Sequence, residues 1–322
     1  VREFCVFDDG AGPALYACGE FLSSGGTSLN HVAKWNGTQW TPLGAGLDGP
    51  ANTIEVFDNG GGPALYVGGT FLHAGQSNAP RIASWDGSSW STPIDSSESE
   101  VDTIFEFVVH DTGAGPRLFA AGEFHETPSY IGRHEVAMLD GDMWQLIAHV
   151  TLKNTNVTGE VRALASMIVD NQPLLIVAGD FQYLNGMSTN SIAAWNGAEW
   201  RPLGIGMASS PPNGATSSVS EIAALVEDGV PVLYIGGYFA NAGGLPASNL
   251  AKWTCVGDFI PGDTNCDGVV NDDDVTPFVQ LLSNRDAYFA TQPNCDTRQA
   301  DVNGDGVIDL FDIDPFVALL AP

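Results

Sequence analysis

The sequence contains few basic residues, and this scarcity restricts what the protein can bind. Its 322 residues include 11 Lys and Arg against 39 Asp and Glu, which gives a formal net charge of −28. Nucleic acid and anionic membrane surfaces repel a surface of this sign, so we expect neither as a partner. No apolar run reaches the ~18 residues that a membrane-spanning helix requires, so we expect no membrane insertion.

Cysteine is also scarce, and its spacing excludes two common roles. The five cysteines form no Cys-x-x-Cys pair, so neither a zinc site nor a thioredoxin-like motif is indicated. The six histidines, at positions 31, 73, 110, 125, 134 and 149, have no recurring ligand spacing. No signal peptide is visible, and the chain opens with Val1, so we expect a mature or trimmed form.

An internal repeat of 50 to 58 residues occupies the first 255 positions. The motif Ala-Leu-Tyr-Ala-Cys-Gly-Glu-Phe at 14–21 returns in variant form at 64–71, 117–124, 174–181 and 232–239. A second motif, Val-Ala-Lys-Trp-Asn-Gly-Thr-Gln-Trp at 32–40, returns at 82–90, 136–144 and 192–200, with a shortened copy at 250–253. We therefore expect one repeat domain over 1–255, with repeats at about 1–50, 51–100, 101–160, 161–220 and 221–255.

Each repeat reads as four short antiparallel strands. An apolar strand meets an Asp/Gly/Pro turn and then the Tyr-x-Gly-Gly strand, and an Asn-Gly or Asp-Gly turn joins the last two strands. Such units predict an all-β fold, a β-propeller of about five four-stranded blades. The motifs resemble Kelch-type, galactose-oxidase-like propellers. The fifth repeat stops after Trp253. An upstream strand trimmed away, residues 255–261, or further blades in the parent protein could complete the ring.

Several features of the repeats could carry chemistry, and each has a simpler structural interpretation. The Trp-Asp-Gly-Ser-Ser-Trp turn at 85–90 resembles a sialidase Asp box that is one residue short, and we interpret it as a hairpin turn. Copper oxidation requires ligands that the histidine spacing does not supply. Three acids at equivalent positions could gather at one mouth of the ring, and a further cluster could bind a metal: Glu20, Glu123 and Asp180, and then His125, Glu126, His134 and Glu135.

The C-terminal segment contains two twelve-residue sequences typical of calcium loops, at 263–274 and 301–312. Oxygen ligands are expected at loop positions 1, 3, 5, 7, 9 and 12, with the backbone carbonyl at position 7. In the first loop these are Asp263, Asn265, Asp267, Val269, Asn271 and Asp274. In the second they are Asp301, Asn303, Asp305, Val307, Asp309 and Asp312. We expect two calcium ions.

The two loops belong to a duplicated segment with an offset of 38 residues. An amphipathic helix is expected after each loop, over 274–282 and 312–320, and neither loop has a long helix before it. Loop and exiting helix together resemble a dockerin, the duplicated calcium module that attaches secreted bacterial proteins to cohesin-bearing scaffolds. The resemblance covers about 258–322, and we expect a small α-helical domain over 256–322.

The dockerin resemblance implies a partner, a cross-link and a location. Positions 10 and 11 of each loop would contact a cohesin-like partner or surface anchor, and here they are Asp272 with Asp273, and Leu310 with Phe311. Cys266 and Cys295 resemble those of GC-type dockerin proteins, and we expect a disulfide between them. An extracellular protein, secreted or attached to the cell surface, is consistent with that disulfide.

Two functions remain open from the sequence. The first is a non-catalytic propeller that binds protein or glycan through its loops and is anchored by the C-terminal module. The second is a polysaccharide-active enzyme that hydrolyses or otherwise cleaves glycosidic bonds, because dockerins commonly carry such enzymes. No catalytic residue is assigned.

Overall fold

The computed structural model describes residues 1–93, 101–126, 129–141, 143–152, 159–169, 171–208, 217–227, 230–254, 260–292, 295, 297–303 and 307–320. The chain divides into two compact units. The first contains residues 1–224 and 233–252, and the second contains residues 225–232 and 253–322.

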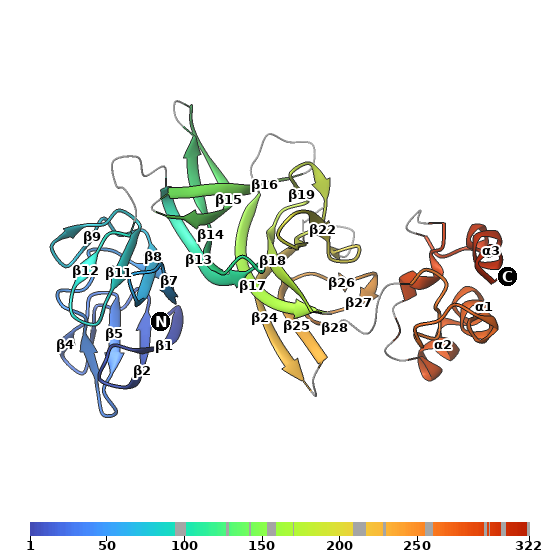
Figure 1. Cartoon of the computed structure of the whole chain (residues 1–322), viewed down its shortest axis with the longest axis horizontal. Coiled ribbons are helices and arrows are strands. Elements are labelled where there is room, and N and C mark those ends of the chain that lie inside the picture. The colour runs from blue at the N-terminus through green and yellow to red at the C-terminus, as the bar shows by residue number, and fades with distance from the viewer. Residues whose placement is uncertain are drawn as a thin grey trace. The chain divides into compact units, whose positions relative to one another are not determined.

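Five antiparallel sheets follow one another along the repeats (Figure 1). The first has the order β1-β2-β5-β6, with β1 at Glu3–Asp8, β2 at Pro13–Cys18, β5 at Val32–Trp35 and β6 at Trp40–Pro42. The second contains β7 (Ala51–Asp58), β8 (Pro63–Gly69), β11 (Ile82–Trp85) and β12 (Trp90–Ser91). The third contains β13 (Val101–Asp111), β14 (Pro116–Glu126), β15 (Ser129–Asp140) and β16 (Met143–Thr151).

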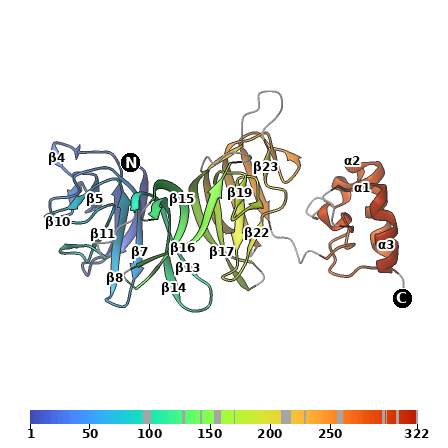
Figure 2. The same cartoon turned by 90° about the horizontal axis from the view of Figure 1, so that it is seen from above.

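The last two repeats continue the same strand order (Figure 2). The fourth sheet contains β17 (Glu160–Val169), β18 (Gln172–Asp180), β21 (Ile192–Trp195) and β22 (Trp200–Pro202). Among the described residues the fifth sheet has three strands, β24 (Ser218–Glu227), β25 (Val230–Tyr238) and β28 (Leu250–Thr254). The fifth repeat thus ends after its third strand, as the sequence predicts.

Two-residue strands form a small hairpin between the second and third strands of four repeats. These are β3 (Ser23–Ser24) with β4 (Thr27–Ser28), β9 (His73–Ala74) with β10 (Ser77–Asn78), β19 (Tyr183–Leu184) with β20 (Met187–Ser188), and β26 (Asn241–Ala242) with β27 (Leu245–Pro246). Strands β16 and β23 (Met207–Ala208) pair with β19 and β26, and Leu47 forms a bridge to Ala74. Each of these pairings joins one repeat to the next.

The core lies between neighbouring sheets and is built from alternating strand residues. Phe7 and Tyr16 of the first sheet pack with Ile54 and Leu65 of the second. Phe57 and Tyr66 of the second sheet pack with Phe107 and Leu118 of the third, and Phe119 and Val136 of the third pack with Leu164 and Leu175 of the fourth. This face-to-face packing of successive four-stranded sheets is the packing of propeller blades.

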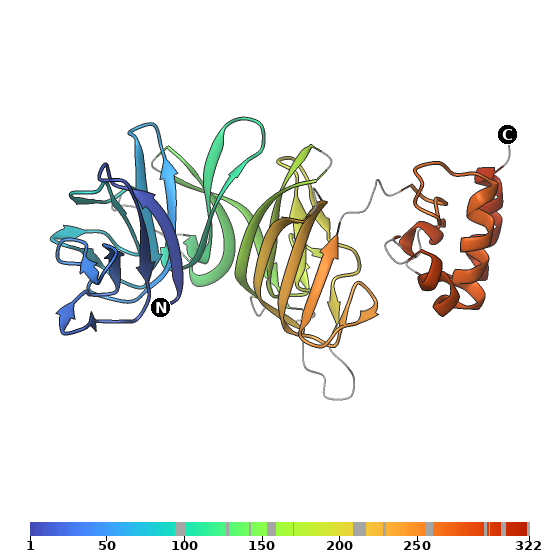
Figure 3. The ribbon, with the colours of Figure 1, turned by 90° about the horizontal axis from the view of Figure 1, so that it is seen from below.

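The C-terminal unit contains short helices around a small core (Figure 3). Helix α1 (Val275–Ser283) follows the 3₁₀ turn η2 (Asp272–Asp274), and α3 (Ile313–Leu320) follows η4 (Leu310–Asp312). Between them lie α2 (Arg285–Thr291) and the 3₁₀ turn η3 (Thr297–Ala300), neither of which the sequence predicted. Phe278 and Phe316, related by the 38-residue duplication, stack with their ring centroids 4.0 Å apart. Within the described residues, no helix is long and apolar enough to cross a membrane.

Candidate functional site

A polar cavity is enclosed by the first strands of all five repeats. Its volume is ≈ 990 Å³, and strands β1, β7, β13, β17 and β24 each contribute lining residues. The charged side chains in its wall are Arg2, Glu3, Glu106, Glu160, Arg162 and Glu221. Arg162 forms an ion pair with Glu160, and Arg2 forms one with Glu20 at 2.6 Å.

A β-bulge directs one side chain per strand into this cavity. The ladder between first and second strands skips Asn52 in β7, Phe105 in β13 and Arg162 in β17. All three line the cavity. A bulge re-aims a side chain and releases a backbone amide from the ladder. The bulges therefore explain why polar residues of apolar strands face a common space.

Side chains of one repeat satisfy backbone groups of the next repeat around the cavity. The Glu3 carboxylate accepts a hydrogen bond from the Ile54 amide at 2.8 Å, and the Thr53 hydroxyl accepts one from the Phe107 amide at 2.9 Å. The Asn52 side-chain amide donates to the Ile104 carbonyl at 2.7 Å. These bonds fix the spacing of neighbouring first strands, so the cavity is a formed feature of the fold.

Burial alters the acidity of the glutamates near this cavity. It raises the pKa of Glu3 to about 7, and the amide of Ile54 limits this rise. It raises the pKa of Glu106 to about 9, and the negative charges of Glu3, Glu221 and Glu55 raise it further. Burial also raises the pKa values of Glu55 and Glu221. Near neutral pH, Glu106 therefore holds a proton and donates hydrogen bonds as a neutral acid.

The acids that the sequence singled out are not the acids that line the cavity. Glu20, Glu123 and Asp180 lie outside its wall, although Thr70, at the equivalent position of the second repeat, lies in it. Sequence reasoning missed Glu3, Glu106, Glu160 and Glu221. The signal available was a glutamate in an otherwise apolar first strand, but only the bulge shows that it faces inward.

The histidines do not form a metal centre in the part of the chain that the structure describes, where no three His, Cys, Asp or Glu side chains are arranged to hold a metal ion. His110 is buried, its Nδ1 lies 2.9 Å from the Ser166 hydroxyl, and burial lowers its pKa. His73 Nδ1 lies 2.7 Å from Asp48. Glu135 is buried, while the side chains of His125, Glu126 and His134 lie outside the described residues.

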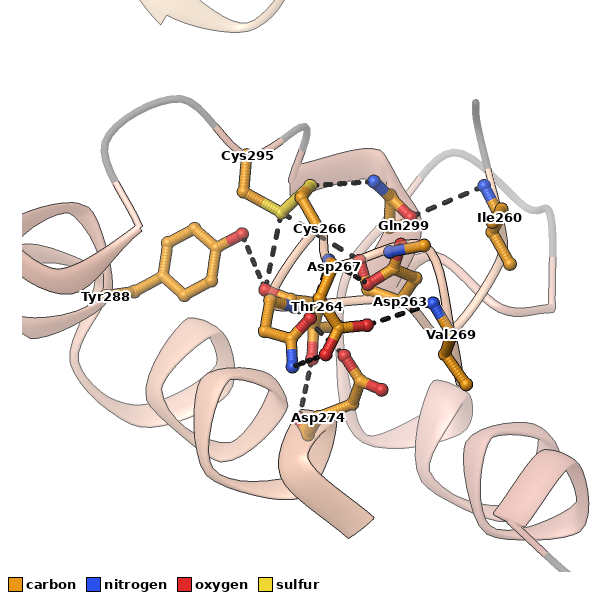
Figure 4. The surroundings of a disulfide bond; sticks show 12 residues. Ile260, Asp263, Thr264, Cys266, Asp267, Val269, Asp274, Tyr288, Cys295 and Gln299 are labelled. Atoms are coloured by element: carbon orange, nitrogen blue, oxygen red, sulfur yellow. Dashed lines mark hydrogen bonds between the residues drawn. A yellow bond between two sulfur atoms is a disulfide. The ribbon is translucent and has the colours of Figure 1, made fainter. Parts of the chain in front are cut away.

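In the first loop, backbone amides hold the acidic side chains (Figure 4). The Asp263 carboxylate accepts from the amides of Asp267 and Gly268 at 3.1 and 2.9 Å. The Asp274 carboxylate accepts from the amides of Asn265 and Asn271 at 3.0 and 2.9 Å. Gly268 has φ +88°, a conformation that a side chain would strain. The loop therefore curls around the ends of its own carboxylates.

The second loop repeats this arrangement 38 residues later. The Asp312 carboxylate accepts from the amides of Asn303 and Asp309 at 3.1 and 2.9 Å. Asp309 and Asn271 cap the short 3₁₀ turns that lead into α3 and α1. Val269 and Val307, the expected carbonyl ligands, have exposed side chains, and Asp301 is partly buried. Asp305 lies outside the described residues.

The burial of these carboxylates bears on whether the loops fit a hard cation. Asp263, Asp274 and Asp312 are 1%, 0% and 0% exposed. Within the described residues none of them pairs with Lys or Arg. Burying an anion without a counter-charge is costly, and a divalent cation bound by oxygen ligands would remove that cost. The donor set therefore fits calcium.

The expected partner positions and the cross-link lie on the same small unit. Leu310 and Phe311 are 73% and 77% exposed, and Asp272 and Asp273 are also exposed. Cys266 and Cys295 form a disulfide, with Cα atoms 5.5 Å apart. The Tyr288 hydroxyl donates to the Thr264 carbonyl at 3.1 Å, which attaches α2 to the first loop.

Five successive sheets around a common cavity define a β-propeller protein with a small helical unit at its C-terminal end. The family model of the Rax2 C-terminal β-propeller domain matches residues 6–223, which is more than half of the chain. The chain belongs to this family. No curated protein matches the sequence. The propeller prediction is confirmed, whereas the Kelch-type and dockerin-like resemblances remain predictions.

Proposed function

We propose that the protein is a non-catalytic binding propeller anchored through its C-terminal unit. In this proposal residues 260–320 form a calcium-dependent, dockerin-like plug that attaches the secreted propeller to a cohesin-like protein or surface anchor. The exposed pair Leu310 and Phe311 is the observation that carries it. Two large apolar side chains more than 70% exposed, directly beside the buried carboxylate of Asp312, are typical of a contact surface held in place by its loop.

Calcium would act here as a structural ligand. The ions would neutralise the loop carboxylates and hold η2 and η4 in position, so that residues 272–273 and 310–311 keep their orientation. The chain's own contribution is the set of backbone amides that hold Asp274 and Asp312. The Cys266–Cys295 disulfide ties the first loop to the segment that precedes the second.

A pull-down of the full chain on a panel of immobilised cohesin domains, with calcium and with chelator, tests this function. We expect retention with calcium and release in chelator. Leu310→Asp combined with Phe311→Asp should abolish retention, because it removes the apolar contact. Asp314→Asn, an exposed change in the first turn of α3, should leave retention unchanged. Retention that survives both chelator and the double substitution would contradict the proposal.

A second candidate function is favoured by the cavity glutamates. Acids with raised pKa values in a cavity are common in active sites, and glycoside hydrolysis uses a pair of carboxyl groups. Release of reducing sugar from a polysaccharide panel, lost on Glu106→Gln, would replace the binding function with an enzymatic one.

A further inference from the structure

One face of the first repeat is apolar and exposed. We define this rear face as Phe4, Val6 and Leu15, which are 53%, 64% and 37% exposed. Phe4 pairs with Ala17 in the ladder, and the same ladder position in the next three repeats is occupied by Ile54, Phe107 and Leu164. Those residues are 1%, 2% and 4% exposed. The position of Leu15 corresponds to Leu65, Leu118 and Leu175, all 0% exposed.

In the later repeats the rear face is covered by the preceding sheet. Ile54 and Leu65 pack against Phe7, Tyr16 and Val32 of the first repeat. Phe107 and Leu118 are covered in the same way by the second repeat, and Leu164 and Leu175 by the third. The Trp90 indole adds a hydrogen bond of 2.9 Å to the Leu43 carbonyl of the preceding repeat. At the corresponding place Trp40 lies against the exposed ring of Phe4, with centroids 6.3 Å apart.

The fifth repeat presents the complementary face without a cover. We define this front face as Tyr234 and Leu250. Leu250 is 64% exposed, whereas its equivalents Val32, Ile82, Val136 and Ile192 are each 0% exposed. Tyr234 is partly exposed, whereas Tyr16, at the same position of the motif, is 0% exposed. Lys252 lies over the Tyr234 ring at 5.7 Å, just as Lys34 lies over Tyr16.

We propose that a second copy of this chain docks head to tail, with its front face on the rear face of the first copy. The occupant follows from the interface that the fold already uses three times, in which an aromatic and a β-branched residue of one sheet cover the Ile/Phe/Leu positions of the next. Each chain carries one face of each kind. Two copies can therefore cover all four faces in a closed, symmetric pair.

Charge sets the conditions for this association. Each copy has a formal net charge of −28, so two copies repel at low ionic strength. Salt screens exposed charges beyond about 10 Å at 0.1 M and does not weaken the apolar contact. Association should therefore become stronger as salt is added, the opposite of an interface held by ion pairs.

Sedimentation velocity of the full chain, across a range of concentrations in low and high salt, tests the proposal. We expect a shift from the 33.9 kDa monomer to a species of twice that mass, favoured by salt. Phe4→Asp and Leu250→Asp should each weaken association at least tenfold. Both residues are already exposed, so neither change should lower the melting temperature. Ile168→Asp is the matched control, because Ile168 is 65% exposed and its equivalents in the first three repeats are Asp8, Asp58 and Asp111.

A mixing experiment separates head-to-tail docking from other arrangements. The Phe4→Asp variant keeps an intact front face, and the Leu250→Asp variant keeps an intact rear face. An equimolar mixture should therefore form a 1:1 pair through the one interface that remains. A wild-type chain that stays monomeric at the highest concentration, as it would if its own two ends closed on each other, overturns the proposal. A mixture that does not pair overturns it too.

Discussion

At the scale of single residues, the cavity glutamates are the least expected feature of the propeller. Glu3, Glu55, Glu106 and Glu221 lie on first strands, where apolar residues pack between sheets. Burial raises the pKa of each of them, and like charges add to the effect at Glu106. The folded state therefore binds more protons than the unfolded chain between about pH 5 and pH 8.

The stability of the propeller should therefore fall as the pH rises. A raised folded pKa favours folding below the unfolded value, near 4.5, and this contribution is lost as the pH passes about 7 for Glu3 and about 9 for Glu106. We expect a loss on the order of 1–3 kcal/mol between pH 5 and pH 8. Chemical denaturation of the full chain at several pH values measures this loss.

The variant Glu106→Gln resembles the protonated acid and should remove part of that dependence. It should be more stable than the wild type at pH 8 and nearly equal to it at pH 5. Glu199→Gln, an exposed change beside Arg201, serves as the control and should alter neither value. A wild-type curve that is flat, or that rises from pH 5 to pH 8, would show that these glutamates are ionised in the folded protein.

At the scale of elements, the second glycine of the Tyr-x-Gly-Gly motif is explained by a close backbone approach. A Cβ on Gly69, Gly122, Gly179 or Gly237 would lie 2.3, 2.5, 2.0 or 2.2 Å from a carbonyl oxygen of the residues leading into the first strand or of its opening residues. The preceding position has no such restriction, since Cys18, Ala121 and Ala178 occupy it in other repeats. Thus only the second glycine is required by the strand pairing.

A pair of adjacent substitutions tests this explanation within one repeat. Gly237→Ala would place its Cβ 2.2 Å from the Ser218 carbonyl oxygen, so we expect a loss of about 1–3 kcal/mol. Gly236→Ala would meet its nearest atom at 3.9 Å and should be neutral or slightly stabilising. Thermal unfolding of both variants compares them directly. Equal destabilisation by the two would mean that general strand propensity, and not the close approach, selects glycine here.

The sequence predicted the elements well where local patterns decide them. The repeated Tyr-x-Gly-Gly and Trp motifs predicted successive sheets of four strands, and the duplicated tail predicted the helices now seen as α1 and α3. It missed α2, because residues 285–291 lack a clear apolar stripe. It also missed the cavity residues Glu3 and Glu106, because a bulge and the neighbouring repeat determine where they point, and neither is visible in a strand's own residues.

At the scale of the whole molecule, two parts with different sources of stability share one chain. The propeller buries apolar side chains between sheets and extends that packing from repeat to repeat. The C-terminal unit has a core of only a few large side chains, with Phe278, Tyr288 and Phe316 among them. It also buries three loop carboxylates, so its folding should depend on its disulfide and on bound calcium.

Differential scanning calorimetry of the full chain, with calcium and with chelator, tests this division most directly. We expect two transitions with calcium, and chelator should lower or abolish the C-terminal transition alone. Asp274→Asn should reproduce the effect of chelator, because it weakens a buried ligand, whereas Asp314→Asn should not. If chelator leaves both transitions where they were, the acidic loops do not hold calcium and the C-terminal unit is not a metal-dependent anchor.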